Sequence, residues 1–381
     1  MEKYRKFADA ATGINPFALV RSPTTLSLVI AAALFPLRLA GALLLLLPLL
    51  FVLDVLVYAF FLVPGMSCVS RLLLAPCQRG LLRGLLFAGG NLGLTRESPK
   101  TVAMANAAGR DAAPAAGDVV VVNMQSPWDM CVLEVAGLLP RCIVAFYVGG
   151  AATTTTAGAS AKKTDDDGSS SDGLLVVGPS PLQRWHVWWH IYGTGTVEFL
   201  RAAAACGGSG AGNSGHNGSV VHLTRLQQRC ERLGVPLIFF PEGSCTNGKG
   251  MLITAPLRTR TAPRRVFVAA IDYDTTAVHT VLRPRRLLSF LFSMSASLHG
   301  SHDPAWYSPP FPVATLRMAV LTASPPTATG EGDTAVVWES AKVRQALCAA
   351  SRSRRALAVG LREKCGYAEA CEGRRAGNVF K

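Results

Sequence analysis

A nearly continuous apolar run, Leu26 to Val63, constrains this chain more than any other stretch. Its only charged residues are Arg38 and Asp54. A helix over this run would be about 57 Å long at 1.5 Å per residue, almost twice the roughly 30 Å hydrocarbon core of a bilayer. The run is therefore too long for one straight membrane span, and Pro36 and Pro48 mark the places where a helix could break.

Two membrane arrangements fit the run. Either a spanning helix covers about Leu39 to Val63 after an interfacial segment, or the run forms a re-entrant hairpin with both ends in the cytosol. A cleaved signal peptide is disfavoured, because the run is too long and begins too far from the amino terminus. Three arginines follow the run and place its carboxyl flank on the cytosolic side, namely Arg71, Arg79 and Arg83.

The overall composition indicates a lipid partner. Half of the residues are apolar and only 16% are charged, below the roughly 25% of an average soluble domain. The net charge of +14 favours anionic partners. We expect a phospholipid membrane and no nucleic acid, because the arginines are scattered and no nucleic-acid-binding module is recognisable. The ten cysteines show no Cys-x-x-Cys spacing, so neither a metal site nor a disulfide framework is predicted.

Changes in composition divide the chain into five parts. A polar leader precedes a membrane anchor, which continues into an amphipathic helix over Leu72 to Leu94. An alanine-rich linker, an α/β domain and a basic tail follow, and one amphipathic helix is expected in the tail from Asp333 to Lys364. The predicted boundaries are 1–25 for the leader, 26–97 for the anchor, 98–118 for the linker, 119–325 for the domain, 151–173 and 203–219 for two low-complexity inserts in it, and 326–381 for the tail.

The most informative short stretch is Leu237 to Gly248, with the sequence LIFFPEGSCTNG. Its first four residues are apolar β-formers and predict a buried strand, which Pro241 must end because proline lacks the N–H that a sheet requires. Glu242 therefore lies at the exit of a strand. The residues from Gly243 onward form a small polar loop whose backbone can approach a ligand, and open α/β sheets bind ligands beyond the carboxyl ends of their strands.

The string FPEGSCTNG resembles a sequence block of the glycerophospholipid acyltransferases, which transfer an acyl group from acyl-CoA to a lysophospholipid. Within that family it is most similar to the lysophosphatidylcholine acyltransferase branch and the related ancient ubiquitous proteins, whose loops also carry Thr-Asn. The resemblance implies that Glu242 and Gly243 hold the phosphate of the acceptor or organise the loop. It also assigns Ser244, Thr246 and Asn247 to the substrate-binding region.

Two further blocks of this family have less specific counterparts. Thr196 to Arg201 is similar to the block in which an aromatic residue and an arginine contact the acceptor, which implies substrate-binding roles for Phe199 and Arg201. Val266 to Ile271 has the strand character of the fourth block, with Val268 in place of the usual proline. The resemblance implies an α/β fold in which a mixed β-sheet is flanked by helices.

The catalytic block of the family contains a histidine base and an aspartate five residues later, in the pattern Asn-His-x-Ser/Thr-x-x-Asp. Here Asn123 and Asp129 stand at the matching places, but Met124 occupies the position of the histidine. A thioether does not accept a proton at neutral pH. None of the seven histidines of the chain has an aspartate five residues later, so the dyad is absent from the whole sequence.

A base from elsewhere is an alternative. His186 and His190 are spaced four residues apart in a tryptophan-rich segment, so on a helix they would share one face, but no third metal ligand accompanies them. Without a histidine partner, Asp129 is either a retained part of the site or a cap of the following helix. Cys245 is interpreted as a small residue that fills the loop, because no base for a nucleophile follows it nearby.

Two functions from different classes follow. In the first, the chain is a membrane-bound protein of phospholipid metabolism with an acyltransferase fold that is catalytically impaired by Met124. It would act on endoplasmic-reticulum or lipid-droplet membranes, with its domain facing the cytosol. In the second, it is an active acyl-CoA:lysophospholipid O-acyltransferase with a relocated base. No bound cofactor is expected; if the protein is active, acyl-CoA would be the co-substrate and a lysophospholipid the acceptor.

Overall fold

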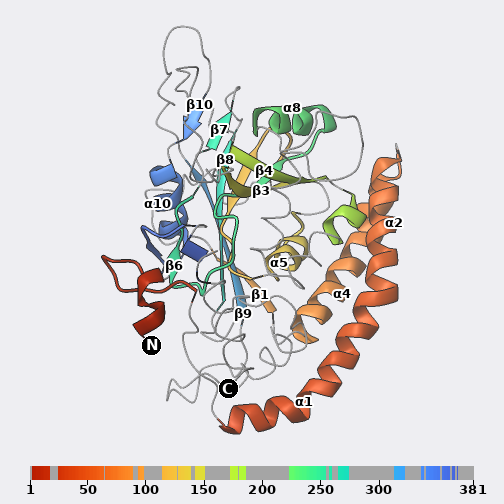
Figure 1. Cartoon of the computed structure of the whole chain (residues 1–381). Coiled ribbons are helices and arrows are strands. Elements are labelled where there is room, and N and C mark those ends of the chain that lie inside the picture. The colour runs from red at the N-terminus through yellow and green to blue at the C-terminus, as the bar shows by residue number, and fades with distance from the viewer. Residues whose placement is uncertain are drawn as a thin grey trace, which may run out of the picture.

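A mixed seven-stranded sheet with helices on both faces forms the centre of the molecule (Figure 1), so the chain has an α/β fold, as the sequence predicts. The strands of this sheet are β1 (Gly93–Glu97), β2 (Val119–Val122), β3 (Ile143–Gly150), β4 (Asp172–Val177), β5 (Leu237–Phe240), β8 (Val266–Tyr273) and β9 (Val313–Leu321). The computed structural model describes residues 2–17, 25–63, 65–88, 93–97, 114–126, 128–138, 142–150, 172–178, 180–185, 223–254, 257–259, 265–273, 313–321, 336–338, 340–351, 354–360, 363–364 and 367.

Four parallel strands form the middle of the sheet. The strand order is β1-β9-β8-β2-β5-β3-β4, in which β8, β2, β5 and β3 run in one direction. The strands β9 and β4 are antiparallel to their neighbours β8 and β3, and β1 pairs in parallel with β9. Because the four central strands share a direction, their carboxyl ends meet at one edge, and this is where open α/β sheets bind ligands.

The central strands are apolar on both faces. Alternate valines of β2 belong to two different cores, and the residues of β5 divide in the same way. One core packs under α4 (Ala75–Ala88) and α5 (Asp129–Val135), and the other under α8 (Leu223–Leu233) and α10 (Ser340–Ala350). Strands that are apolar throughout are typical of parallel sheets covered on both faces. The predicted strand Leu237–Phe240 is confirmed, and it ends directly before Pro241.

One long helical path lies beside this domain. It begins with α1 (Thr25–Leu44), continues through a π-helical stretch (Leu45–Leu50) and ends with α2 (Phe51–Leu62). Within the described residues, its segment Ala32–Phe60 is long and apolar enough to span a membrane. Pro48 lies in the π-helical stretch, where the backbone bond that a proline cannot donate is accommodated without ending the helix. In Figure 1 the path curves along one side of the domain, and α4 returns beside it.

Two predictions about helix extents are wrong. The helix expected from 72 to 94 ends at Ala88, and β1 follows it, so the sheet begins within the segment that was assigned to the anchor. The single helix expected from 333 to 364 is divided into β10 (Val336–Trp338), α10 and β11 (Arg355–Ala356). The two strands pair with β7 (Leu257–Thr259) and β6 (Gly250–Met251), so this part of the chain packs on the domain.

Candidate functional site

Two of the sequence blocks meet at the carboxyl edge of the sheet. β2 ends at Val122 and β5 at Phe240, and these strands are adjacent and parallel. The loops that follow them therefore emerge side by side. The backbone N–H of Met124 donates a 2.8 Å hydrogen bond to Oε2 of Glu242, so the two loops are joined directly.

Glu242 organises the loops around it. Its second carboxylate oxygen, Oε1, accepts a 3.0 Å hydrogen bond from the backbone N–H of Leu252. Glu242 is only 1% exposed. Burial raises the pKa of its carboxyl group, while the positive charge of Arg354 acts in the opposite direction. Both oxygens accept from backbone amides of two different loops, a geometry that fits the organising role that the resemblance implies for Glu242.

The residue after Glu242 must be glycine in this loop. Gly243 has a φ angle of +63°, in the left-handed region that glycine tolerates best. A Cβ at this position would lie 1.9 Å from the carbonyl oxygen of Tyr147 in β3. The loop is therefore packed directly against the neighbouring strand, and Ser244 and Thr246 are buried.

Gly243→Ala is expected to destabilise the fold more than Gly234→Ala does. Gly234 has nearly the same φ angle, +65°, but a Cβ there meets no atom within 4 Å. The matched variant thus isolates the backbone strain, about 1–2 kcal/mol, and the clash with Tyr147 adds about 1–3 kcal/mol. Urea unfolding of the two purified variants measures the difference. Equal losses in the free energy of unfolding for the two variants would show that β3 shifts to accommodate the extra methyl group.

The carboxylate of Asp129 accepts hydrogen bonds from its own loop and from β8. Its Oδ2 accepts hydrogen bonds from the backbone N–H groups of Gln125 (2.6 Å) and Ser126 (2.9 Å), and its Oδ1 accepts one from the Tyr273 hydroxyl at 2.6 Å. Burial raises the pKa of the Asp129 carboxyl group to about 6, against the effect of these three bonds. The alternative that Asp129 caps the following helix is wrong, because its carboxylate binds amides that precede α5, and Trp128 is the N-cap residue.

Asp129→Asn is expected to weaken the pH dependence of stability between about pH 4 and pH 6. The folded chain holds the Asp129 proton up to about pH 6, whereas an unfolded aspartate releases it near pH 3.9. The contribution of Asp129 to the free energy of unfolding is thus fully present below pH 4, and it falls by roughly 3 kcal/mol as the pH rises through 6. An asparagine side chain still accepts from the loop amides but does not titrate. Unfolding free energies at several pH values test this, and an unchanged slope would contradict it.

The side chain at the missing-base position is part of the core. Met124 is 3% exposed and belongs to the apolar cluster that also contains Trp128, Met130 and Cys245. Burial raises the pKa of the Cys245 thiol to about 12, although the Lys364 ammonium lowers it. A thiol with such a pKa holds almost no thiolate at neutral pH, which agrees with the interpretation of Cys245 as a residue that fills the loop.

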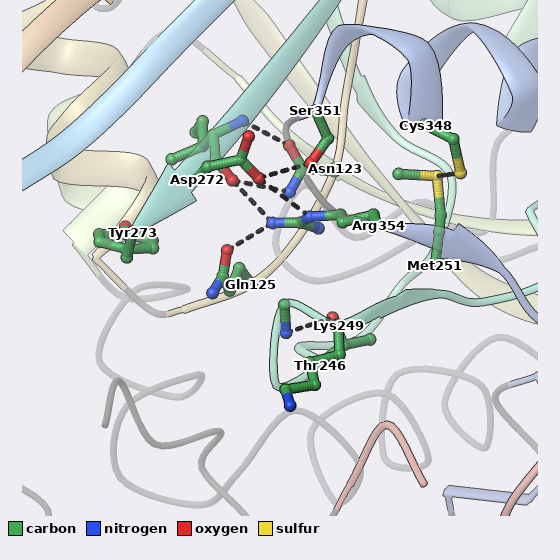
Figure 2. Close-up of polar contacts among 12 residues, drawn as sticks. Asn123, Gln125, Thr246, Lys249, Met251, Asp272, Tyr273, Cys348, Ser351 and Arg354 are labelled. Atoms are coloured by element: carbon green, nitrogen blue, oxygen red, sulfur yellow. Dashed lines mark hydrogen bonds and ion pairs between the residues drawn. The ribbon is translucent and has the colours of Figure 1, made fainter. Parts of the chain in front are cut away.

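Arg354 fixes the block that contains Met124 to the end of β8 (Figure 2). It donates from Nη2 to the carbonyl oxygen of Ile271 at 2.7 Å and to Oε1 of Gln125, and its Nε lies 3.2 Å from Oδ1 of Asp272. The side chain of Asn123 exchanges two further bonds with the backbone of Ile271. These contacts hold the loop that contains Met124, and the positive charge of the buried Arg354 acts on both candidate carboxylates, Asp129 and Glu242.

Not every predicted site residue lies in the described part of the chain. Asn247 is there, but its backbone N–H and its side-chain amide donate to the carbonyl oxygens of Pro16 and Asn15 in the leader, so its polar groups face the chain itself. Phe199, Arg201, His186 and His190 lie outside the described residues. Among the residues that are described, no three His, Cys, Asp or Glu side chains form a group that could hold a metal ion.

The residues that surround Asp129 were not predicted from the sequence. Tyr273 could have been found, because β8 is a parallel neighbour of β2 and its last residue must lie at the same edge of the sheet. Arg354 carries no such signal, since it follows a helix far along the chain. A comparison of the chain with family models, curated proteins and solved structures finds no match.

Proposed function

We propose that this chain is a membrane-bound protein with a glycerophospholipid-acyltransferase-like site that binds lysophospholipid and acyl-CoA but is catalytically impaired. One observation carries the proposal: the backbone of Met124 is hydrogen-bonded to Glu242, so the two blocks that resemble this family lie together at the ligand-binding edge of an α/β sheet. Asp129 belongs to the same assembly through the loop amides that precede it. Endoplasmic-reticulum and lipid-droplet membranes are the proposed locations.

The chemistry of acyl transfer explains the impairment. The acceptor hydroxyl oxygen forms an ester bond with the thioester carbonyl carbon, the carbon–sulfur bond breaks, and the hydroxyl proton passes through a base to the departing thiolate of CoA. Residue 124 offers a thioether for that proton, and a thioether is not a base. The carboxylate that would orient a histidine already accepts three hydrogen bonds within the protein, including one from Tyr273.

The alternative function is an active acyl-CoA:lysophospholipid O-acyltransferase with a relocated base. Its candidate bases, His186 and His190, lie outside the described residues. Turnover separates the two functions, because both include substrate binding. An active enzyme would transfer acyl groups without any substitution, whereas the impaired protein would bind the same ligands and leave them intact.

Glu242→Gln is expected to weaken lysophosphatidylcholine binding by about fivefold to tenfold, the effect of losing one hydrogen bond of roughly 1 kcal/mol. The glutamine side chain keeps one oxygen acceptor, so either Met124 or Leu252 loses its partner and the loop loosens. Isothermal titration of the full chain in detergent micelles, with lysophosphatidylcholine and palmitoyl-CoA as separate probes, measures the binding.

Leu233→Asp provides a matched control for this titration. Leu233 is 50% exposed at the end of α8, away from the candidate site, and its substitution should leave both affinities unchanged. If the unmodified chain binds neither probe, the proposed function is wrong. If Glu242→Gln binds as tightly as the unmodified chain, Glu242 does not organise a ligand-binding loop.

A further inference from the structure

The leader that precedes the apolar helix is attached to the domain. Phe7 and Phe17 pack edge-on and tilted against Tyr367, with ring centroids 5.5 Å and 5.7 Å apart. The backbone N–H of Asn247 donates to the carbonyl oxygen of Pro16 at 2.8 Å. Oδ1 of Asp9 accepts a 2.9 Å hydrogen bond from the N–H of Ala358. The chain is thus already part of the domain before its helix begins.

The start of the helix cannot lie across a bilayer from the leader. The eight peptide steps from Phe17 to Thr25 reach at most about 29 Å when fully extended. A bilayer is roughly 40–45 Å thick with its headgroups, and its hydrocarbon core alone is roughly 30 Å. Thr25 therefore lies on the side of the membrane where the leader and the domain lie.

The far end of the helix is also attached to the domain. Asp54, in α2, is 1% exposed, and its carboxylate accepts hydrogen bonds from Arg184 at 2.6 Å, Gln78 at 2.8 Å and the indole N–H of Trp185 at 2.9 Å. Gln78 lies on α4 and also donates to Glu134 of α5 at 2.6 Å. A charge that would be costly in lipid is therefore satisfied by the domain itself.

The opposite face of the same helix is apolar and exposed. Leu50, Asp54 and Val57 form a buried stripe that faces the domain at helical spacing. The outward side chains include Leu37, Leu44, Leu49, Val52, Leu56 and Leu62, which are between 39% and 72% exposed. This apolar surface extends over both α1 and α2. The surface of a soluble protein usually exposes apolar residues only singly or in small patches.

We infer that the helix from Thr25 to Leu62 does not cross the membrane but lies in the plane of one leaflet, with its outward apolar face in the acyl chains of a phospholipid bilayer. This inference rests on the membrane association in the proposed function. All residues from 25 to 62 are helical, so there is no turn for a re-entrant hairpin. Arg83, which is exposed on the adjacent α4, and the net charge of +14 suit an anionic lipid surface.

The orientation of the two termini tests this arrangement. The full chain, with one epitope tag before Met1 and another after Lys381, is expressed in sealed microsomes whose cytosolic face is outward. The in-plane helix predicts that protease removes the leader tag without detergent, because leader and domain share the cytosolic side. A single-span protein with a lumenal tag serves as the control for vesicle integrity. Protection of the leader tag would overturn the inference.

Substitutions on the outward apolar face test whether phospholipid acyl chains cover it. Leu44→Asp and Val52→Asp are expected to lower partitioning onto vesicles of phosphatidylcholine and phosphatidylserine at least about tenfold each. Leu233→Asp, at 50% exposure on α8, should leave partitioning unchanged. Vesicle flotation measures partitioning, and unchanged urea midpoints in detergent show that the variants fold.

Two outcomes would contradict a lipid occupant. Unchanged flotation of both variants would mean that this face is outside the leaflet. Variants that still float but change from dimer to monomer in light scattering would show that a second copy of the chain covers the face. Neither readout depends on acyl transfer or on lysophospholipid binding, so a failure of the proposed enzyme-like site would leave these results interpretable.

Discussion

Met124→His is expected to raise acyl transfer from acyl-CoA to a lysophospholipid by about 10²–10⁴-fold over the unmodified chain, which is the contribution of a positioned general base. The backbone at this position is already fixed by the bond from Met124 N–H to Glu242. The loop is also held by Asp129, whose Oδ2 binds the amides of Gln125 and Ser126. A histidine there would belong to the loop whose amides the Asp129 carboxylate binds, so that this carboxylate could orient it once the imidazole replaces the buried thioether.

The gain from the histidine depends on Tyr273. Its hydroxyl donates to Oδ1 of Asp129 at 2.6 Å, the oxygen that a histidine at position 124 would need. We therefore expect Met124→His combined with Tyr273→Phe to exceed Met124→His alone, while Tyr273→Phe alone stays at background. Initial rates with purified protein measure all three. A double variant slower than the single one would mean that Tyr273 positions Asp129 for catalysis.

Asp54→Leu is expected to destabilise the folded chain by about 3–5 kcal/mol, the usual effect of removing one partner of a buried ion pair. Arg184, which is 4% exposed, would lose its 2.6 Å partner, and Gln78 and Trp185 would lose their acceptor. Burial raises the pKa of the Glu134 carboxyl group, so this neighbour is a poor substitute as a counter-charge. The midpoint of urea unfolding in detergent micelles measures the loss.

Two further variants show whether the loss of stability comes from the buried ion pair. The double variant Asp54→Leu with Arg184→Met should recover most of the loss, because apolar replacements of buried ion pairs are often neutral. Val52→Leu is a matched apolar change on the exposed face of the same helix and should alter stability by less than about 0.5 kcal/mol. If Asp54→Leu is as stable as the unmodified chain, α2 is not held to the domain at Asp54.

Local sequence predicted the centre of the fold well. The apolar β-formers before Pro241 predicted the strand β5 with correct ends. The amphipathic character expected in the tail is confirmed within α10, where Val343, Leu347 and Ala350 are buried. These features depend on neighbouring residues and on periodicity, so they are visible in one sequence. The α/β class was predicted from the family resemblance.

Contacts between distant residues could not be predicted. Arg354 contacts Gln125 across more than half of the chain, and Asp54 contacts Arg184, which lies 130 residues further along the chain. A lone aspartate in an apolar helix has no periodic pattern that identifies its partner. The division of the tail into β10, α10 and β11 was missed for the same reason, since each short strand exists only because a distant strand pairs with it.

The turnover of the unmodified chain tests the central claim most directly. The purified protein is incubated with radiolabelled acyl-CoA and a panel of lysophospholipids, next to Met124→His from the same preparation. We predict that the unmodified chain transfers acyl groups no faster than the buffer control, and that only the histidine variant exceeds it. Rapid acyl transfer by the unmodified chain, at a rate equal to or above that of Met124→His, would contradict the account.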